Sequence, residues 1–298
     1  MLPDVPIAYL ERISTYYQVL GYGAPYVWAQ FDSAPFRVLT KPLAECRVAL
    51  VTTAAPYQPD KGNQGPGAPY NAAAKFYCVY AGETAGDPDL RISHLAIDRA
   101  HTTGEDQNSY FPLPALRRAK AAGRIGGLTR HFFGLPTNRS QRTTIDVDCA
   151  ELLARCKADF ADVAILVANC PVCHQSVALA ARALEESGIA TAVMGCAKDI
   201  IEHAGVPRFL FSDFPLGNAA GKPGDTASQD LTLAQALDLL ETARQPRSTL
   251  QSSLQWSGSP DWKLDYCNID QLTPQEIARH RAEFDRGKQV AKTLRKTC

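Results

Sequence analysis

The chain has 298 residues, and it lacks an excess of either charge as well as any long apolar segment. Its 31 basic side chains balance 31 acidic ones. A protein that binds nucleic acid through its phosphates needs a clear surplus of Lys and Arg, so the composition argues against nucleic acid as a partner. The longest apolar run, at 163–168, is far shorter than the roughly 20 residues that cross a bilayer. We therefore expect no membrane segment.

The N-terminal residues also lack the features of an export signal. Pro3, Asp4, Pro6 and Glu11 interrupt the region where such a signal needs a basic start and a continuous apolar stretch. The nine cysteines are odd in number and scattered along a long chain, which is not the pattern of a secreted disulfide framework. We expect a cytoplasmic protein in which most cysteines are reduced.

The composition that remains is that of a globular enzyme, with 45% apolar and 21% charged residues. Residues 1–43 mix proline with aromatic side chains, which predicts an arm wrapped on a core. Residues 44–225 carry an α/β pattern and form the predicted catalytic core, either as one unit or as two Rossmann-like lobes at 44–145 and 146–225. Residues 226–298 predict a helical extension.

The core alternates β-branched apolar runs with amphipathic segments. Strands are predicted at 47–53, 91–98, 162–170, 189–196 and 207–214, with helices between them from residue 150 onward. Strands that alternate with helices form a parallel sheet whose two faces are covered. The predicted fold class is therefore α/β, a parallel sheet built from Rossmann-like βα units.

Polar residues follow several of these predicted strands, at the edge where ligands bind in open α/β sheets. His101, in the segment after residue 98, is a candidate acid or base. The candidate substrate contacts are Thr52, Thr53, Asp98, Asp106, Asn108, Asn169, Asp213 and Asn218. The expected partner at this edge is a small-molecule substrate.

The most specific local pattern is Cys170-Pro171-Val172-Cys173-His174, between a strand and a helix. A thiol at a helix N-terminus faces unpaired backbone donors and the positive end of the helix dipole, and both favour the thiolate. Pro171 suits the first helical turn. We predict Cys170 as the nucleophile, Cys173 as the resolving thiol and His174 as a second candidate acid or base. A buried structural pair is the alternative.

Two other interpretations of this pattern are weaker. The sequence CxxCH also attaches haem c, but that requires an axial partner and is not expected between a sheet strand and its crossover helix. Structural zinc requires two further ligands, and the chain has no second CxxC and no HxxxH. The primary hypothesis therefore includes no cofactor.

Four blocks between about residues 44 and 225 resemble component B of the glycine, sarcosine, betaine and D-proline reductases, which are often selenoproteins. They are VALVTT with Lys61-Gly62-Asn63, the segment 98–112 with its following helix, the block around Cys170, and DFPLGNAAGKP. The resemblance implies a reductive cleavage of a carbon–heteroatom bond in a small substrate derived from an amino acid. It also implies an electron donor or partner subunit. In the selenoprotein pattern the selenocysteine precedes the first cysteine by three residues, which is Val167 here, so Cys170 would have to be the attacking atom.

Two alternatives remain open. Cys170, Cys173 and Cys196 end neighbouring predicted strands and together would hold an iron–sulfur cluster with one open iron, which is suited to a desulfidase acting on a thiocarbonyl compound. The other alternative is a non-catalytic accessory protein with structural cysteines. The basic C-terminal helix, at 273–298 with a stripe of Ile277, Phe284, Ala291 and Leu294, predicts a solvated helix, and a contact between subunits of a homo-oligomer is the weaker hypothesis.

Overall fold

The computed structural model describes residues 4–24 and 26–294 and is built on one sheet. The strands are β1 (Arg47–Thr52), β3 (Tyr80–Glu83), β5 (Gly127–Leu128), β6 (His131–Gly134), β7 (Val163–Val167), β8 (Ala190–Gly195), β9 (Arg208–Phe211) and β10 (Ser248–Gln251). Their order is β10-β9-β8-β7-β1-β6-β3, with β5 also paired to β1. Only β3 runs antiparallel, along β6. The predicted α/β class with a parallel, Rossmann-like sheet is confirmed.

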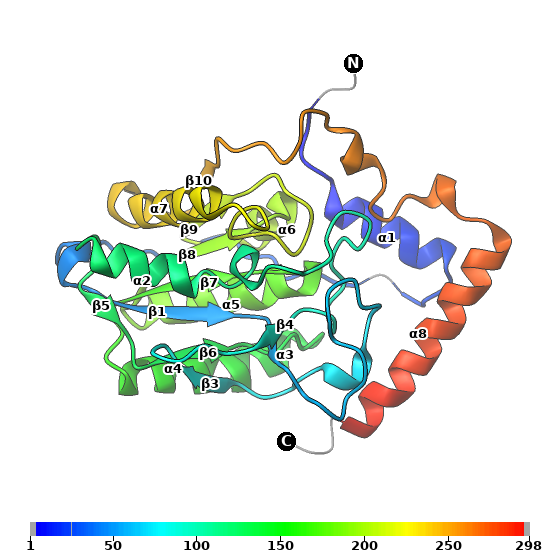
Figure 1. Ribbon diagram of the computed structural model, residues 1–298, viewed down its shortest axis with the longest axis horizontal. Coiled ribbons are helices and arrows are strands. Elements are labelled where there is room, and N and C mark those ends of the chain that lie inside the picture. Colours follow the sequence, from blue (N-terminus) through cyan, green and yellow to red (C-terminus); the bar gives the residue numbers. More distant parts are fainter. Residues whose placement is uncertain (1–3, 25, 295–298) are drawn as a thin grey trace.

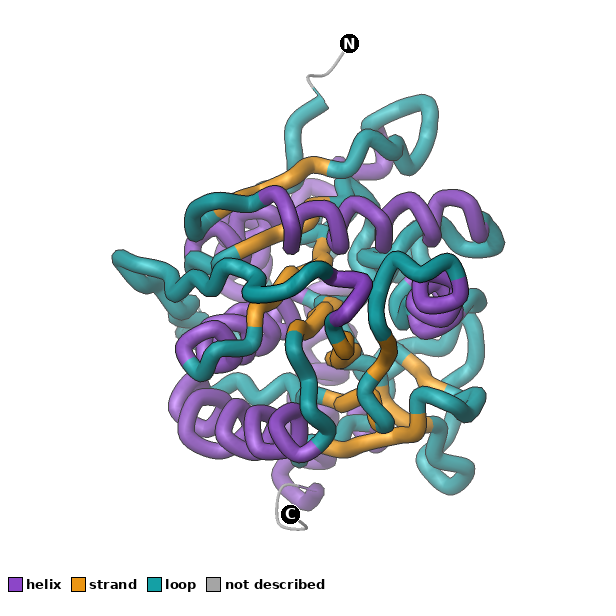
Figure 2. Tube along the Cα trace, turned by 90° about the vertical axis from the view of Figure 1, so that its left-hand side faces the viewer, coloured by secondary structure: helices purple, strands orange, loops and turns teal. Residues whose placement is uncertain are grey.

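Helices cover both faces of this sheet (Figures 1 and 2). On one face α2 (Leu113–Ala121) packs beside α7 (Thr226–Thr242), and on the other α5 (Pro171–Glu186) packs between α4 (Cys149–Ala158) and α6 (Lys198–Ala204). A π-helical turn, Thr144–Asp148, connects the short α3 (Gln141–Thr143) to α4. The layers are those expected of strands joined by crossover helices.

The central strands have the composition that a doubly covered sheet requires. Every residue of β7, β8 and β9 is buried, and so is every residue of β1 after Arg47. Strands buried on both faces are continuous apolar runs rather than alternating ones. This explains why the sequence located these strands to within a few residues.

Two predictions about the secondary structure were wrong. Residues 91–98 do not form a strand: β4 is only Leu90–Arg91, paired antiparallel with β2 (Ala55–Pro56), and the chain then turns. In this segment all residues from Ile92 to Asp98 are buried except Ala96, so the apparent alternation of apolar side chains did not mark one buried face. The second error was β10, which pairs with β9 and continues the core sheet inside the segment predicted as a helical extension.

The sheet contains strands from both of the lobes suggested at 44–145 and 146–225. β1, β5 and β6 come from 44–145 and β7 to β9 from 146–225, yet β1 pairs directly with β7 over five residue pairs. One continuous sheet therefore crosses the boundary suggested at residue 145.

The two ends of the described chain lie at the carboxyl ends of the strands, to which β1 points in Figure 1. The N-terminal helix α1 (Tyr9–Val19) contacts α6, and the long α8 (Pro274–Leu294) contacts the 3-10 turn Ala72–Ala74. Phe284 of α8 stacks on Tyr22 with ring centroids 3.9 Å apart. The stripe predicted on α8 thus packs on the N-terminal arm through Phe284, while residues 295–298 and the side chain of Leu294 lie outside the described residues.

Further short helical turns connect these elements. They are the 3-10 turns Leu43–Glu45, Gln107–Ser109, Asp261–Leu264 and Ile269–Gln271. In the described part of the chain, none of the helices has both the length and the apolar character needed to cross a membrane.

Candidate functional site

The candidate site lies where the strand order changes direction. From β1 the chain continues to β5 and β6 on one side of it, whereas β7 and then β8 and β9 follow on the other side. In open α/β sheets the crevice at such a switch point, beyond the carboxyl ends of the strands, is the usual ligand site. Thr52 and Thr53 stand at the end of β1, and Asn169 and Cys170 follow β7.

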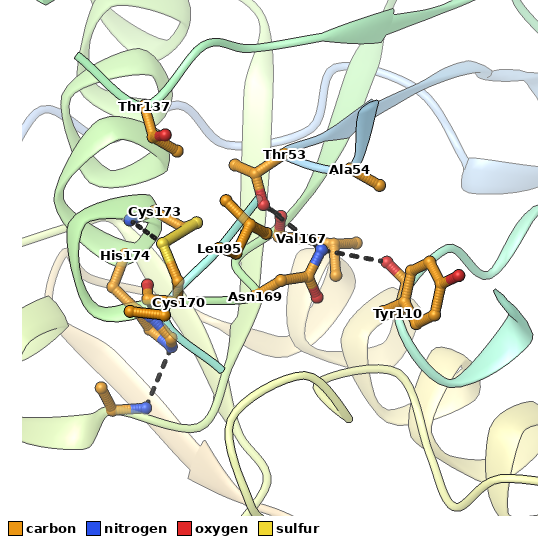
Figure 3. Close-up of a disulfide and its surroundings, with 12 residues drawn as sticks. Thr53, Ala54, Leu95, Tyr110, Thr137, Val167, Asn169, Cys170, Cys173 and His174 are labelled. Atoms are coloured by element: carbon orange, nitrogen blue, oxygen red, sulfur yellow. Dashed lines mark hydrogen bonds between the residues drawn. A yellow bond between two sulfur atoms is a disulfide. The ribbon is translucent and has the colours of Figure 1, made fainter. Parts of the chain in front are cut away.

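Cys170 is the N-cap of α5. Its backbone is extended, and its sulfur accepts a hydrogen bond from the backbone N–H of Cys173 at 3.2 Å. Cys170 and Cys173 form a disulfide with Cα atoms 4.9 Å apart (Figure 3). The side chains are 4% and 0% exposed. The two thiols that the sequence singled out are therefore in bonding contact, at a helix N-terminus that favours negative charge on Cys170 once the pair is reduced.

His174 links this helix to the next strand. Its Nδ1 lies 2.7 Å from the carbonyl oxygen of Cys170, and its Nε2 accepts the backbone N–H groups of Cys196 and Ala197 at 2.9 and 3.0 Å. A carbonyl can only accept, so Nδ1 carries the proton and the ring is neutral. Burial lowers the pKa of His174 to about 4. Both ring nitrogens are thus already hydrogen-bonded, Nδ1 to Cys170 and Nε2 to the residues after β8.

Gly195, the last residue of β8, permits this arrangement. A Cβ at this position would lie 2.6 Å from Nε2 of His174, inside van der Waals contact. Glycine is the residue that lets another group approach the backbone this closely. A glycine is therefore required at the end of β8 by the close approach of His174 rather than by a turn.

Asn169 and Thr53 lie beside the disulfide (Figure 3). The side-chain Nδ2 of Asn169 donates to Thr53 Oγ1 at 3.3 Å and to the carbonyl of Tyr110 at 3.4 Å. Its Oδ1 has no hydrogen-bond partner in the described structure. Thr52 lies next to them, and its hydroxyl accepts the N–H of Ala54 at 3.1 Å.

His101 belongs to a different group of side chains. Its Nδ1 lies 3.1 Å from a carboxylate oxygen of Asp98, and its Nε2 lies 3.2 Å from one of Asp265. Burial raises the pKa of Asp98, and the neighbouring His101 opposes that rise. No hydrogen bond or ion pair in the described residues joins His101 to Cys170 or Cys173.

The other predicted substrate contacts are distributed around the same edge. Asp213 pairs with Lys263, which also binds Asp4 at 2.5 Å, so Lys263 ties the N-terminal arm to the loop after β9. Asn218 donates to Thr102 at 2.8 Å. Asp106 accepts the N–H groups of Asn108 and Gly224 and the side-chain amide of Gln229, and so holds two loops together.

The comparisons with known proteins point to one group of enzymes. The chain is 28% identical over 205 residues to the D-proline reductase subunit gamma of Acetoanaerobium sticklandii, an alignment that covers 68% of this chain and 81% of that protein. It is 25% identical over 195 residues to the glycine reductase complex component B subunit gamma of Carboxydothermus hydrogenoformans, covering 64% of this chain and 44% of the relative. Both relatives support the resemblance of this chain to the reductase component B family. No family model and no solved structure matches.

The three cysteines proposed for a cluster do not meet in this component B homologue. Although β7 and β8 are neighbours, Cys196 is a buried free thiol, and the backbone of Phe214 and Asn218, on the loop after β9, acts to lower its pKa. Burial raises its pKa strongly. Within residues 4–24 and 26–294, no three His, Cys, Asp or Glu side chains form a group that could hold a metal ion. These residues therefore do not fit an iron–sulfur cluster, and we derive no step through one.

Sequence analysis missed His94, a buried histidine whose ring faces the backbone of Thr53. The ring is 2% exposed. The backbone of Thr53 faces the ring and favours its protonated form, but burial dominates and lowers the pKa of His94 to about 3. The sequence offered no signal, because His94 stood in the middle of a segment that we predicted as a strand.

Proposed function

We propose that this protein is a dithiol reductase component that cleaves a carbon–heteroatom bond in a small substrate derived from an amino acid. The observation that carries the proposal is the Cys170–Cys173 pair at the N-terminus of α5 and at the switch point of the sheet. The two relatives, a D-proline reductase subunit gamma and a glycine reductase complex component B subunit gamma, support the same class of reaction.

The proposed step begins with the reduced pair. The thiolate of Cys170 attacks the carbon that carries an ammonium group, a C–S bond forms, and the C–N bond breaks with release of the amine. The thiolate of Cys173 then attacks the sulfur of Cys170, so that the disulfide forms and the C–S electron pair stays on carbon, which takes up one proton. Two electrons have passed from the dithiol to the substrate. An external reductant, delivered by a partner protein, returns the pair to its dithiol form.

The proton for this carbon is assigned to His101. His174 already donates from Nδ1 to Cys170 and accepts at Nε2, so its proton cannot leave without breaking the contact that positions the nucleophile. His101, beside Asp98, is the other histidine of the two predicted from the sequence. General acid–base groups of this kind contribute roughly 10²- to 10⁴-fold to a rate.

The test is a single turnover with the reduced protein under anaerobic conditions. Glycine, D-proline, sarcosine or betaine is added without reductant. Mass spectrometry measures the disulfide and the cleavage product, which is the released amine or, for the cyclic D-proline, the ring-opened amino acid that keeps its amine. One equivalent of each is expected from the wild type, none from Cys170→Ser, and a rate lowered by about 10²-fold from His101→Gln. Native labelling with iodoacetamide at neutral pH should modify Cys170 after reduction. A reduced Cys170 that stays unmodified well above neutral pH would favour an accessory protein with structural cysteines.

A further inference from the structure

A cavity of about 160 Å³ lies at the edge of the sheet opposite to the thiols. It is lined from Val206, which precedes β9, and from Arg247, which precedes β10, together with Gly205 at the end of α6. Because β7 to β10 are parallel, these residues stand at the amino ends of the strands, whereas Cys170 follows the carboxyl end of β7. The cavity is therefore separate from the site already described.

The cavity has an apolar floor and a charged rim. Ile201, Val206 and Phe209 line it and are 0%, 3% and 1% exposed. Glu202 and Arg247 also line it, and both side chains are exposed. Solvent therefore reaches the charged side of the cavity, while its floor belongs to the core.

The two charges on the rim are opposite, yet they do not pair. Arg247 donates from Nη1 to the backbone carbonyl of Glu202 at 3.2 Å and from Nη2 to the carbonyl of Phe31. Oε1 of Glu202 accepts the hydroxyl of Thr249 at 2.8 Å. Within residues 4–24 and 26–294, neither charged group forms an ion pair. A guanidinium has five N–H donors and a carboxylate has two oxygens, so both groups keep free capacity for a ligand.

The backbone holds Arg247 in a conformation that is unusual for arginine. Its φ is 59°, in the left-handed region that favours glycine and costs other residues roughly 1–2 kcal/mol. A Cβ at Gly205 would lie 2.6 Å from Nη2 of Arg247, so the glycine makes room for the guanidinium. Strain of this kind is concentrated at sites where a side chain is needed in one place.

A second cation acts on the same side of the cavity. Arg182 of α5 is 8% exposed and donates to the carbonyl of Gly205 at 2.7 Å. Burial lowers the pKa of Arg182, Glu186 opposes this change, and the positive charge of Arg247 adds to it. The rim is thus positive beside Gly205 and negative at Glu202.

We propose that this cavity binds a small zwitterionic amino acid, with its carboxylate on Arg247, its ammonium group on Glu202 and its side chain on the apolar floor. Arginine binds carboxylates through charge-assisted hydrogen bonds, which are the stronger kind. The volume limits the ligand, because a cavity of about 150 Å³ holds benzene, whereas drug-sized ligands need roughly 300–1,000 Å³. Alanine has as many non-hydrogen atoms as benzene. The inference uses no thiol and does not rest on the proposed function.

Isothermal titration calorimetry of the disulfide-bonded protein tests the ligand class, since no dithiol is then available for turnover. The probes are L-alanine, propionate, which lacks the ammonium group, and ethylamine, which lacks the carboxylate. We expect alanine to bind with one site per chain, and each analogue to bind at least about tenfold more weakly. No binding of alanine, or equal affinities for the three probes, overturns the proposal.

Variants test the position of the site. Arg247→Gln and Glu202→Gln should each weaken alanine binding at least about tenfold. Arg244→Gln removes an exposed cation that does not line the cavity, and as the matched control it should keep the wild-type affinity. Thr249→Phe, on the edge strand β10, should fill the cavity and abolish binding, and phenylalanine suits a strand.

Circular dichroism and thermal unfolding report whether each variant folds. If Arg247→Gln does not, Glu202→Gln and Thr249→Phe decide. Alanine binding that survives in the folded cavity variants places the ligand elsewhere and overturns the inference. A protein that binds alanine in this cavity but gives no single turnover contradicts only the proposed function, and a protein that turns over but does not bind alanine contradicts only the cavity site.

Discussion

Two buried polar regions lie at the same edge of the sheet, and they differ in how their polar groups are satisfied. In the charged region, Lys263 binds two carboxylates and a backbone carbonyl, and His101 lies between two carboxylates. Beside the thiols, the Oδ1 of Asn169 has no partner in the described structure. Satisfied networks rigidify a fold, whereas unmet groups are kept for function. The comparison supports the proposal that binding and redox chemistry belong to the region of the thiols and structural ties to most of the charged region.

The largest effect is expected from the one histidine that is fully bonded inside the crevice. His174→Ala removes a partner from two backbone N–H groups and one carbonyl, all buried. We expect the free energy of unfolding to fall by about 3 kcal/mol, with slower iodoacetamide labelling of reduced Cys170. Urea denaturation measures the first effect, and His203→Ala is the control. A loss below about 1 kcal/mol would mean that His174 does not hold the two elements together.

The stability of the protein is expected to depend on pH through Asp148, in the π-helical turn Thr144–Asp148. Burial raises the pKa of Asp148 to about 6, although Asn138 donates to its carboxylate at 2.7 Å. The folded protein therefore binds more protons than the unfolded chain between about pH 4 and 6, and stability falls as the pH rises through this range. Relative to Asp148→Asn, the wild type should lose up to about 3 kcal/mol between pH 4 and 7. Parallel stability curves for the two proteins would contradict the assignment.

In the charged region, we expect a substitution to lower the stability of the protein and to leave the thiol chemistry intact. Lys263→Met removes the cation between Asp213 and Asp4, and burial already raises the pKa of Asp213. We expect a loss of about 2 kcal/mol, less than for a fully buried pair because Asp4 is exposed. Hydrogen exchange should quicken in α1, while the labelling rate of reduced Cys170 changes less than about twofold. A large fall in that rate would show that the two regions act as one site.

The sequence predicted the parts of this protein in which one physical cause dominates. Continuous apolar runs located β1, β7, β8 and β9, and the thiol pair at a strand-to-helix junction located the crevice. The role of His174 was not predictable, because it depends on backbone groups of Cys196 and Ala197 and on the space left by Gly195. Strand β10 was not predictable either, because its residues are half-buried or exposed and do not form a continuous apolar run.

The position of Lys263 has a consequence for the order of folding during synthesis. The residue joins Asp213 on the core to Asp4 at the start of the described chain, and Arg12 of α1 donates to its carbonyl. Contacts over about this sequence separation form late, because the whole intervening chain must be available first. A nascent chain that has emerged only as far as α7 can pair β1 with β7 and β8 with β9, but it lacks Lys263 as the ion-pair partner of Asp213. The carboxyl-end edge of the sheet therefore acquires this tie only after residue 263 has been synthesised.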